Sequence, residues 1–204
     1  MEPVRAPPLL SAVVDRNVEI ELLPPGNGVD ASIDDVWHVL SVVDEEFVPP
    51  LSARTDSLSM ELRSDLTQPL TPESMFNGPV TYFESSRSEF TLIARVDGKV
   101  AGILGFLPDY HDPHLPGLSD LGPTTRVTTI AVLPNHRRSG VATALEAALA
   151  DLPEPSLRPT VTVRTWSTNR KALGLFRKRG YGALLHLPDD RGPGISTVYL
   201  SRSA

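Results

Sequence analysis

Cysteine is absent from the 204 residues of the chain. That absence excludes a disulfide-stabilised scaffold, a thiolate metal site and a cysteine nucleophile. A long apolar segment is also missing, because the longest stretches without Asp, Glu, Lys or Arg are ten residues long, at 74–83, 127–136 and 192–201. A membrane-spanning helix needs about 20 apolar residues, and the N-terminal MEPVRAPPLL has acid and proline where a signal peptide has basic and apolar residues. We therefore predict a soluble, cytoplasmic protein that has no membrane partner.

The remaining composition is that of an ordinary globular domain. Hydrophobic residues make up 40% and charged residues 22% of the chain, which differs from disordered and collagen-like proteins. A chain of 204 residues can bury a core of its own and fits one domain with a tail. Pro3, Pro7 and Pro8 keep the N-terminus from forming a helix. We therefore predict a flexible tail over residues 1–15 and a single domain over residues 16–204.

The net charge of −6 conceals an uneven distribution along the chain. Residues 1–125 contain 20 acids and 7 bases, a net charge of −13, whereas residues 126–204 contain 5 acids and 12 bases, a net charge of +7. The acidic total argues against nucleic acid as a partner, but a basic half can bind a compact polyanion. Unevenly spread surface charge explains the same numbers, so both interpretations stay open.

Hydrophobic periodicity predicts a succession of strands and helices. Strands are expected at residues 17–23, 90–96, 100–106, 124–132, 160–165, 181–187 and 196–201, and helices at residues 32–47, 140–151 and 169–179. The dipeptide Asp97-Gly98 between two β-rich runs predicts a tight hairpin. The stretch 51–65 is compatible with a loop or a short helix, whereas residues 66–80 and the proline-rich residues 108–123 are expected to be loops. This order of elements predicts an α/β fold around a mixed sheet.

The most informative segment joins a strand to a helix through a tight turn. Within IAVLPNHRRSGVATAL (residues 130–145), Arg137, Gly140 and Ala142 form the pattern R-x-x-G-x-A where the helix begins. The first N–H groups of a helix lack internal partners, and the helix dipole makes that end positive. Gly140 and Ala142 leave these amides accessible, and two adjacent arginines add positive charge, so the turn is suited to a diphosphate. An ordinary turn with solvent-facing arginines has the same spacing.

Two other phosphate-binding motifs are excluded. A Walker-type loop requires G-x-x-x-x-G-K-[ST], but Gly140 is followed by Val141 and Ala142. The dinucleotide-binding fingerprint requires three glycines after the strand, and this turn has one.

The segment resembles the acetyl-CoA motif of the GNAT acetyltransferase superfamily, with strand, proline, Arg-x-x-Gly-x-Ala and helix in the same order. The family's second motif, N-x-x-A-x-x-L-Y-x-x-x-G-[FY], is matched in spacing by Asn169, Ala172, Leu175, Phe176, Gly180 and Tyr181. The resemblance therefore rests on two motifs at the right separation within residues 124–182, and the earlier elements fit the family only loosely.

The resemblance implies a GNAT-like fold. Such a fold has a twisted, mostly antiparallel mixed sheet of about seven strands flanked by helices, with two parallel central strands splayed to admit CoA. It implies that the amides of pantetheine pair with backbone groups left free by the splay, and that a backbone N–H stabilises the oxyanion. The residues implied to bind the cofactor are Ile130, Ala131, Val132, Arg137, Arg138, Ser139, Gly140, Val141, Ala142, Thr143, Asn169 and Phe176.

Phe176 departs from the family motif, which usually has Tyr at this position. That Tyr commonly protonates the departing thiolate, and phenylalanine has no proton to give. General acid catalysis contributes about 10²–10⁴-fold, so its loss slows transfer without abolishing it. Tyr110, Ser167, Tyr181 and water are alternative proton donors, and none is selected by the sequence. We favour the interpretation that Phe176 packs against the apolar arm of the cofactor.

The general base is left open. The strand before the turn carries threonines where some family members carry a carboxylate, namely Thr124, Thr125, Thr128 and Thr129. The other candidates are Glu45, Glu46, Glu84, Asp109, His111, Asp112 and a relayed water.

The loop sequence DYHDPH brings His111 and His114 close to aspartates. Two histidines three residues apart in a proline-broken loop are not held in a fixed geometry, and no third strong ligand is indicated. We therefore expect no metal and interpret residues 108–123 as a lid over the acceptor pocket.

These features predict an enzyme, an N-acetyltransferase that uses acetyl-CoA as cosubstrate. A primary amine would attack the thioester directly while both substrates are held in one groove. The acceptor is expected to be a small molecule or a peptide amine, and the acidic N-terminal half suggests a cationic one. The alternative is a non-catalytic acyl-CoA-binding sensor or regulatory module. An acyl donor longer than acetyl stays open, and a homodimer is compatible with the resemblance.

Overall fold

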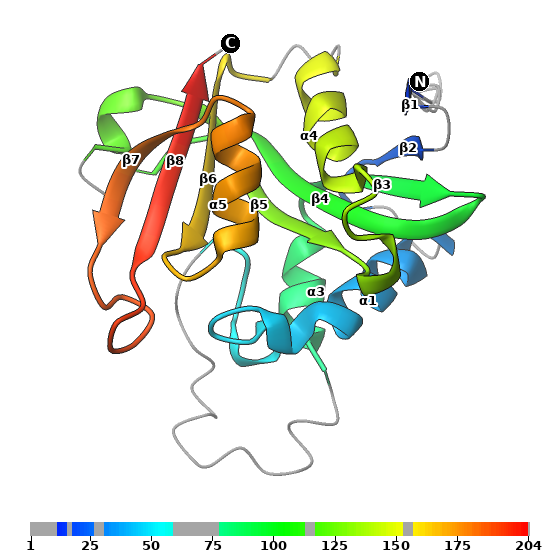
Figure 1. Cartoon of the computed structure of the whole chain (residues 1–204), viewed down its shortest axis with the longest axis horizontal. Helices are drawn as coiled ribbons and strands as arrows, with labels where there is room; N and C mark the ends of the chain where they lie inside the picture. Colours follow the sequence, from blue (N-terminus) through cyan, green and yellow to red (C-terminus); the bar gives the residue numbers. More distant parts are fainter. Residues whose placement is uncertain are drawn as a thin grey trace, which may run out of the picture.

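An eight-stranded sheet forms the centre of the computed structural model, which describes residues 12–15, 18–26, 31–58, 78–112, 117–152 and 157–203. The strands are β1 (Ala12–Asp15), β2 (Val18–Leu23), β3 (Phe90–Val96), β4 (Lys99–Tyr110), β5 (Thr124–Val132), β6 (Thr160–Trp166), β7 (Gly182–Leu187) and β8 (Thr197–Ser203). They lie in the order β1-β2-β3-β4-β5-β6-β8-β7 (Figure 1). Neighbours pair antiparallel except β5 and β6, which are parallel. The mixed, mostly antiparallel sheet is thus confirmed.

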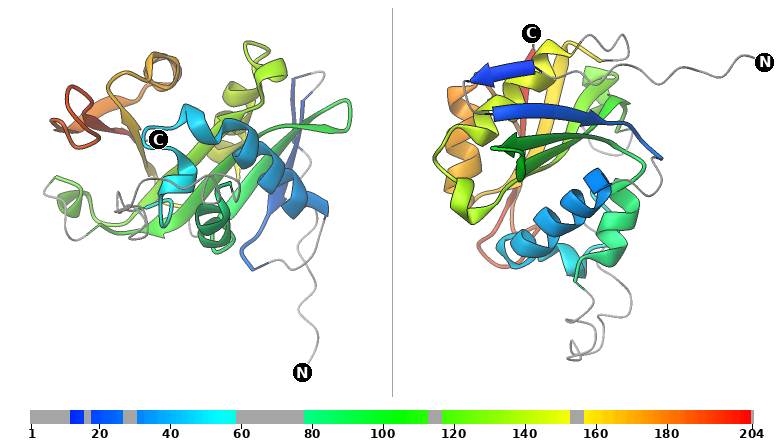
Figure 2. Two further views of the ribbon diagram at one scale, coloured as in Figure 1. Left: turned by 90° about the horizontal axis from the view of Figure 1, so that it is seen from below. Right: turned by 90° about the vertical axis from the view of Figure 1, so that its right-hand side faces the viewer.

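Helices cover both faces of this sheet (Figure 2). One face carries α1 (Ala31–Val43) and α3 (Val80–Ser86), and the other carries α4 (Val141–Asp151) and α5 (Arg170–Lys178). Short 3₁₀ turns complete the connections: η1 (Asp44–Glu46), η2 (Leu51–Ala53), η4 (Ser119–Leu121) and η5 (Pro134–His136). None of the helices in these described ranges has the length and apolar character needed to cross a membrane.

Two hydrophobic cores result from the alternation of side chains along the central strands. Leu104 and Val127 belong to the core beneath α4 and α5. Ile103 and Ala131 belong to the core beneath α1 and α3, where Tyr82 is also fully buried. The central strands are therefore apolar on both faces, as expected for a sheet covered by helices on both sides.

The hairpin expected around Asp97-Gly98 is confirmed. Asp97 and Gly98 have φ values of 51° and 73°, so both central residues adopt the left-handed conformation that a tight type I′ turn requires. β3 and β4 pair on either side of it, from Val96 with Lys99 to Phe90 with Phe106.

Two local expectations are corrected, and one helix was not expected. Residues 12–15 were expected to belong to a loose tail, but they form β1, because the free edge of β2 offers backbone partners to this short segment. Residues 108–110 were expected to be loop, but β4 continues through them, because β5 pairs with Tyr110 through Thr124 despite Pro108. The helix α3 had no periodic signal in its seven residues.

Residues 1–11, 59–77 and 113–116 lie outside the described parts, as does most of the predicted 66–80 loop.

A buried carboxylate joins α4 to the C-terminal strands. Glu146 on α4 is fully buried and accepts hydrogen bonds from Arg179 and from the hydroxyl of Tyr181. Its other ion pair, with Arg202 of β8, measures 3.1 Å. Burial of a carboxylate is tolerated when charged and hydrogen-bonding partners surround it, so this cluster ties α4, the end of α5 and β8 together.

We expect Glu146→Ala to lower the free energy of unfolding by about 3 kcal/mol, because two arginines lose their shared carboxylate and a cavity remains. Urea denaturation followed by circular dichroism measures the change. The matched control is Glu84→Ala, which removes an exposed ion pair with Arg87 and should cost less than about 1 kcal/mol. Equal losses in the two variants would contradict the role assigned to Glu146.

Candidate active site

The parallel strands β5 and β6 pair over only three residues. Their register runs from Thr125 with Val161 to Val127 with Val163. Beyond that point the strands diverge, as Figure 1 shows, leaving residues 128–132 and 164–166 on two facing edges. Backbone N–H and C=O groups on such edges need partners, so the fork is a place where an extended ligand can pair with the sheet.

A β-bulge at Thr128 accounts for the divergence. In the register between β4 and β5, Gly105 lies opposite Thr129 and Phe106 opposite Val127, so Thr128 is an extra residue. A bulge bends its strand and strengthens its twist, which turns the end of β5 away from β6. Gly102 permits the close approach of β4 to the bent strand, because a Cβ atom there would lie 2.6 Å from the carbonyl oxygen of Ala131.

A groove of about 920 Å³ follows the fork. Both strand edges line it, together with the turn before α4, the first turn of α4 and one side of α5. Eleven of the twelve predicted cofactor-binding residues line it: Ile130, Ala131, Val132, Arg137, Arg138, Gly140, Val141, Ala142, Thr143, Asn169 and Phe176. The twelfth, Ser139, does not, and its exposed hydroxyl donates to the carbonyl of His136.

The turn into α4 presents free amide groups to the groove. Gly140 is the N-cap residue and has a φ of 90°, a left-handed conformation that favours glycine. No side chain caps the helix, and its first internal bond runs from the Ala144 N–H to the Gly140 carbonyl oxygen at 2.9 Å. The N–H groups of residues 141–143 therefore have no partner within the helix and, with the helix dipole, create a site for an anion.

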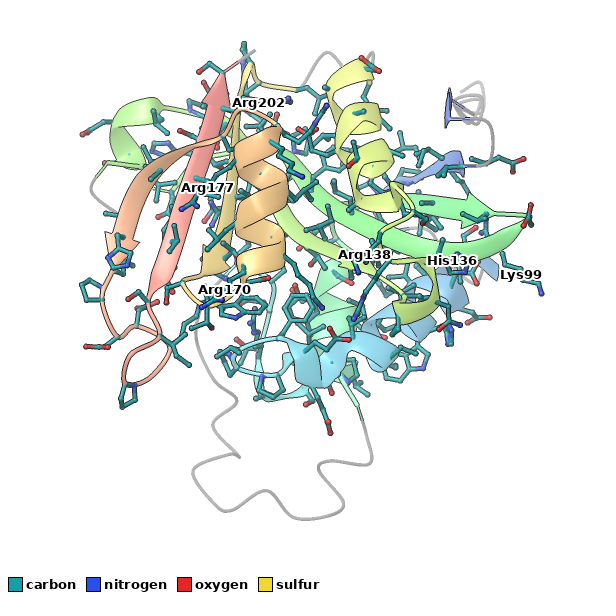
Figure 3. The ribbon with its side chains drawn as sticks, viewed as in Figure 1. Lys99, His136, Arg138, Arg170, Arg177 and Arg202 are labelled. Atoms are coloured by element: carbon teal, nitrogen blue, oxygen red, sulfur yellow. The ribbon has the colours of Figure 1, made fainter. Side chains whose placement is uncertain are left out.

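The two adjacent arginines of the turn have different roles. Arg137 donates from Nε to the carbonyl of Val132 at 3.0 Å and from Nη2 to Glu46 at 2.6 Å, so its guanidinium braces the end of β5 against η1. Arg138 has a φ of 64° and an exposed side chain, and it lies on the turn beside α4 (Figure 3). On the α5 side of the groove, Lys171 adds positive charge.

Asn169 begins α5 and is tied to β6. Its side-chain oxygen accepts a hydrogen bond from the Ala172 N–H, which caps the helix, and its amide donates to Thr165 Oγ1, each at 3.2 Å. The bond to Thr165 ties Asn169 to the neighbouring strand β6 and fixes the second wall of the groove.

Phe176 is 1% exposed and lies at the inner wall of the groove. Its ring packs edge-on against Tyr181, with 5.1 Å between the ring centroids. The Tyr181 hydroxyl donates to Glu146, and burial raises its pKa, so Tyr181 is a poor proton donor. The Tyr110 hydroxyl donates to Asp112, and the Ser167 hydroxyl accepts from the Ser196 N–H. None of the three proposed substitutes lines the groove.

Of the acidic and histidine side chains predicted as base candidates, only Glu46 lines the groove. Glu45 and His111 are exposed, Glu84 pairs with Arg87 and Asp109 pairs with Arg158. Glu46 does line the groove, but it forms the ion pair with Arg137. Asp112 accepts from Tyr110.

Two buried groups beside the bulge were not among the predicted candidates. The Tyr82 hydroxyl from α3 lies 2.6 Å from Thr129 Oγ1, and burial raises the Tyr82 pKa to about 12. Glu89 accepts a hydrogen bond from Thr128, and burial raises its pKa. Thr128 and Thr129 were the sequence signal for this cluster, since consecutive threonines in a central strand need polar partners when buried.

Metal-ligating side chains do not gather in groups of three anywhere in the described residues. His114, the second histidine of the DYHDPH loop sequence, lies outside those residues.

Known proteins similar to this chain include GNAT acetyltransferases. The model of the acetyltransferase (GNAT) family matches residues 56–181, whereas no curated protein matches the chain. Among solved structures, an N-acetyltransferase from Staphylococcus aureus Mu50 is 14% identical, with a TM-score of 0.57, and the match covers 92% of this chain and 98% of that one.

Two further solved structures have the same fold. A ribosomal-protein-alanine N-acetyltransferase from Brucella melitensis is 15% identical with a TM-score of 0.53, covering 86% of this chain and 98% of that one. A GNAT family acetyltransferase from Elizabethkingia anophelis, crystallised with acetyl-CoA, is 11% identical with a TM-score of 0.55, covering 93% and 100%.

We expect Gly102→Ala to destabilise the protein by about 1–3 kcal/mol, because the new methyl group forces β4 away from the bent part of β5. The control is Gly174→Ala in α5, where a Cβ atom meets nothing within 4 Å. That control should stabilise by about 0.5–1 kcal/mol through helix propensity. Thermal unfolding of both variants measures the two effects, and a stable Gly102→Ala variant would refute the close-approach argument.

Proposed function

Because the chain belongs to the GNAT acetyltransferase family, we propose that it is an acetyl-CoA-dependent N-acetyltransferase whose acceptor is a primary amine. The observation that carries the proposal is the fork between β5 and β6, which opens into a groove ending at the uncapped N-terminus of α4. Acetyl-CoA supplies an activated acyl thioester, and the groove offers complementary groups along its length.

The groups along the groove match the parts of this cosubstrate in order. The amides of residues 141–143 and the side chain of Arg138 suit the diphosphate, with Lys171 across the groove. The free edge of residues 130–132 suits the two amides of the pantetheine arm. Phe176 provides an apolar surface at the inner wall. In this arrangement we expect a backbone N–H near the bulge to stabilise the oxyanion that develops on the carbonyl.

The amine attacks from the other side of the fork, where α1 and α3 cover the sheet. Four arginines lie near one another here. The positive charge of Arg164 lowers the pKa of Arg54, Arg126 and Arg191, and the charge of Arg54 also lowers that of Arg191. Burial, together with the neighbouring arginines, lowers the pKa of Arg54 and Arg126 to about 10. Asp44, Asp112 and Asp190 offset this positive charge only in part, since the pKa values stay lowered.

Arg126 shows that, in the described part of the chain, this region has a buried positive group with a nitrogen that lacks a hydrogen-bond acceptor. It is 3% exposed, its guanidinium lies 4.9 Å from the ring centre of Tyr199, and its Nη1 has no hydrogen-bond partner among the described residues. A buried guanidinium with a spare donor favours a nearby anion. The cationic acceptor suggested by the acidic N-terminal half is therefore less well matched than a small-molecule or peptide amine that also carries a carboxylate or another anion.

A non-catalytic acyl-CoA-binding module is the second candidate. The observation that favours it is the replacement of the family tyrosine by Phe176, with no tyrosine hydroxyl lining the groove among the described residues. Because the CoA thiolate is a fairly good leaving group, this loss slows transfer rather than preventing it, so the enzymatic function is preferred.

Release of free CoA thiol in the presence of an amine panel tests the proposal. The panel pairs each amino acid or peptide carrying a carboxylate with its amide, and includes a polyamine as the cationic member. We expect amine-dependent thiol release, greatest for the members that carry the carboxylate. Binding of acetyl-CoA without release for any amine would support the sensor function instead. Acetyl-CoA alone gives the background rate of hydrolysis.

A matched pair of variants tests the placement of the diphosphate. We expect Gly140→Asp to abolish the rise in melting temperature that CoA produces, because a carboxylate beside the free amides repels the diphosphate. Gly140→Asn has nearly the same size and the same strain at a φ of 90°, but no charge, and should keep most of the stabilisation. If both variants bind CoA equally, the diphosphate lies elsewhere.

A further inference from the structure

Glu89 is a buried carboxylate beside the fork. It directly precedes β3 and is 4% exposed, and its two oxygens accept hydrogen bonds from the hydroxyls of Thr128 on β5 and Ser57. No lysine or arginine in the described ranges forms an ion pair with it. An unpaired buried carboxylate is costly, so a structural role alone does not explain it.

Gly105 of β4 lies against the contact between Glu89 and Thr128, where a side chain would not fit. A Cβ atom on Gly105 would lie 2.9 Å from Thr128 Oγ1 and 3.0 Å from Glu89 Oε2. Both distances are shorter than ordinary contacts, so β4 has a residue without a side chain where the two groups meet. Gly105 has no positive φ that would otherwise require glycine.

Thr128 connects this carboxylate to the groove. It is the bulged residue of β5, it is only half buried, and it lines the groove at the fork. Thr128 therefore borders the space available to substrates, while its hydroxyl donates a hydrogen bond to Glu89. Thr129, the next residue, also lines the groove, but it is only 5% exposed and its hydroxyl bonds to Tyr82, so Thr128 is the threonine that joins the groove to Glu89.

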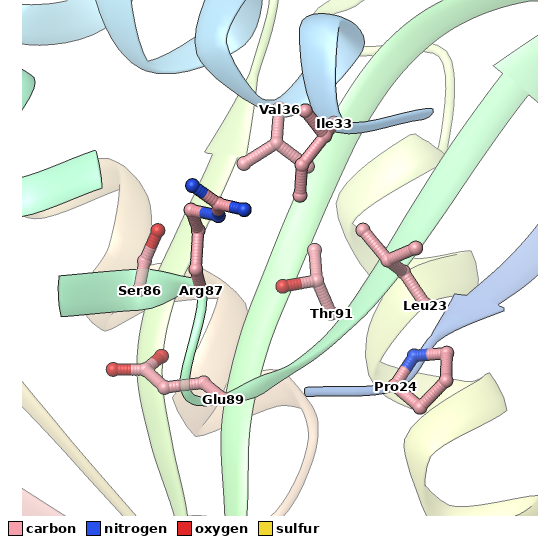
Figure 4. Close-up of a pocket in the computed structure, with 8 residues that line it drawn as sticks. All are labelled: Leu23, Pro24, Ile33, Val36, Ser86, Arg87, Glu89 and Thr91. Carbon is pink, nitrogen blue, oxygen red and sulfur yellow. The ribbon is translucent and has the colours of Figure 1, made fainter. Parts of the chain in front are cut away.

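A second small space adjoins Glu89 on its other side. A cavity of about 10 Å³ is lined by Glu89, Ser86, Arg87 and Thr91, together with apolar residues of β2 and α1 (Figure 4). This is close to the volume needed for one water, and three of the lining side chains besides Glu89 are polar. A water in this cavity would give Glu89 a proton partner that is separate from the groove.

We propose that Glu89 is the proton acceptor of the transfer and that it acts through the hydroxyl of Thr128. The inference rests on the proposed acetyltransferase function. The amine nitrogen bonds to the acetyl carbon while the bond from that carbon to sulfur breaks. The amine proton passes to Thr128 Oγ1 as Thr128 gives its own proton to Glu89. The CoA thiolate takes a proton from water, and Glu89 returns its proton to solvent.

The surroundings of Glu89 raise its pKa, which makes the ionised carboxylate a stronger base than an exposed glutamate. Burial raises its pKa, and the charge of Asp56 adds to this, while the hydrogen bonds from Ser57 and Thr128 oppose it. The other groups facing it are Tyr82 of α3, whose pKa of about 12 keeps it neutral, Arg87 at the small cavity and Arg164, which donates to the Ser57 carbonyl. Proton transfer is most effective when the pKa of the base lies near the working pH.

The dependence of kcat/KM on pH tests this proposal, measured with the best amine of the panel. We expect the wild-type rate to fall at acidic pH through two ionisations, that of the amine and that of Glu89. Glu89→Gln should lose the second ionisation and lower kcat by about 10²–10⁴-fold, while its KM for acetyl-CoA stays within a few-fold.

Two substitutions at Thr128 separate the proton path from packing. Thr128→Ser keeps the hydroxyl and should retain both ionisations and most of the rate. Thr128→Val keeps the shape, removes the hydroxyl and should reproduce the loss seen in Glu89→Gln. A merely structural role would not remove an ionisation from the profile.

The outcomes distinguish this inference from the function on which it rests. If Glu89→Gln and Thr128→Val keep the wild-type pH profile and rate, the proton acceptor lies elsewhere although the enzyme is an acetyltransferase. If the wild type itself transfers to no amine, the proposed function fails first. Glu89→Gln is expected to be at least as stable as the wild type at pH 8, because it removes a buried charge. If Glu89→Gln unfolds, the pH profiles and rates of Thr128→Ser and Thr128→Val test the proton path without it.

Discussion

The parting of β5 from β6 is the constraint on which the site depends. In a closed sheet every backbone group of a central strand is paired, but here five residues of β5 face an open edge. Unpaired backbone groups require partners from water or ligand. The opening is stable because the other edge of β5 keeps its pairing with β4 and because helices cover both faces. A rigid frame around an unsatisfied edge is a means of holding an extended molecule in a fixed position.

The single extra residue at Thr128 connects this opening to the chemistry beside it. Side chains normally alternate between the faces of a strand, yet Thr128 and Thr129 both bond to groups on the α1 and α3 side, Glu89 and Tyr82. Ile130 then returns to the α4 side. The bulge therefore bends β5 to open the groove and, at the same position, turns two hydroxyls toward the buried acid and phenol. The bulge at Thr128 is therefore the structural cause of both the groove and the buried polar contacts to Glu89 and Tyr82.

Local patterns predicted the groove walls formed by β5, α4 and α5 far better than the buried cluster around Glu89. The extent of β5, the role of Gly140 before α4 and the start of α5 near Asn169 follow from hydrophobic alternation and terminal residues that act over a few positions. Glu89 could not be found in this way, because a glutamate before a strand usually lies in solvent. Its burial is a product of β5, β4 and the Ser57 segment meeting in space, and β1 likewise exists only because β2 has an open edge.

Most bases of the positive half of the chain lie at specific structural positions. Two of these bases, Arg179 and Arg202, form ion pairs with buried Glu146. Four others line the groove: Arg137, Arg138, Lys171 and Lys178. A third group lies around the fork and consists of Arg126, Arg164 and Arg191. Random surface charge would not place cations where burial lowers their pKa, as it does for Arg126 and Arg191. Such positions cost stability, and this cost is understandable if anions complete the site when both substrates are bound.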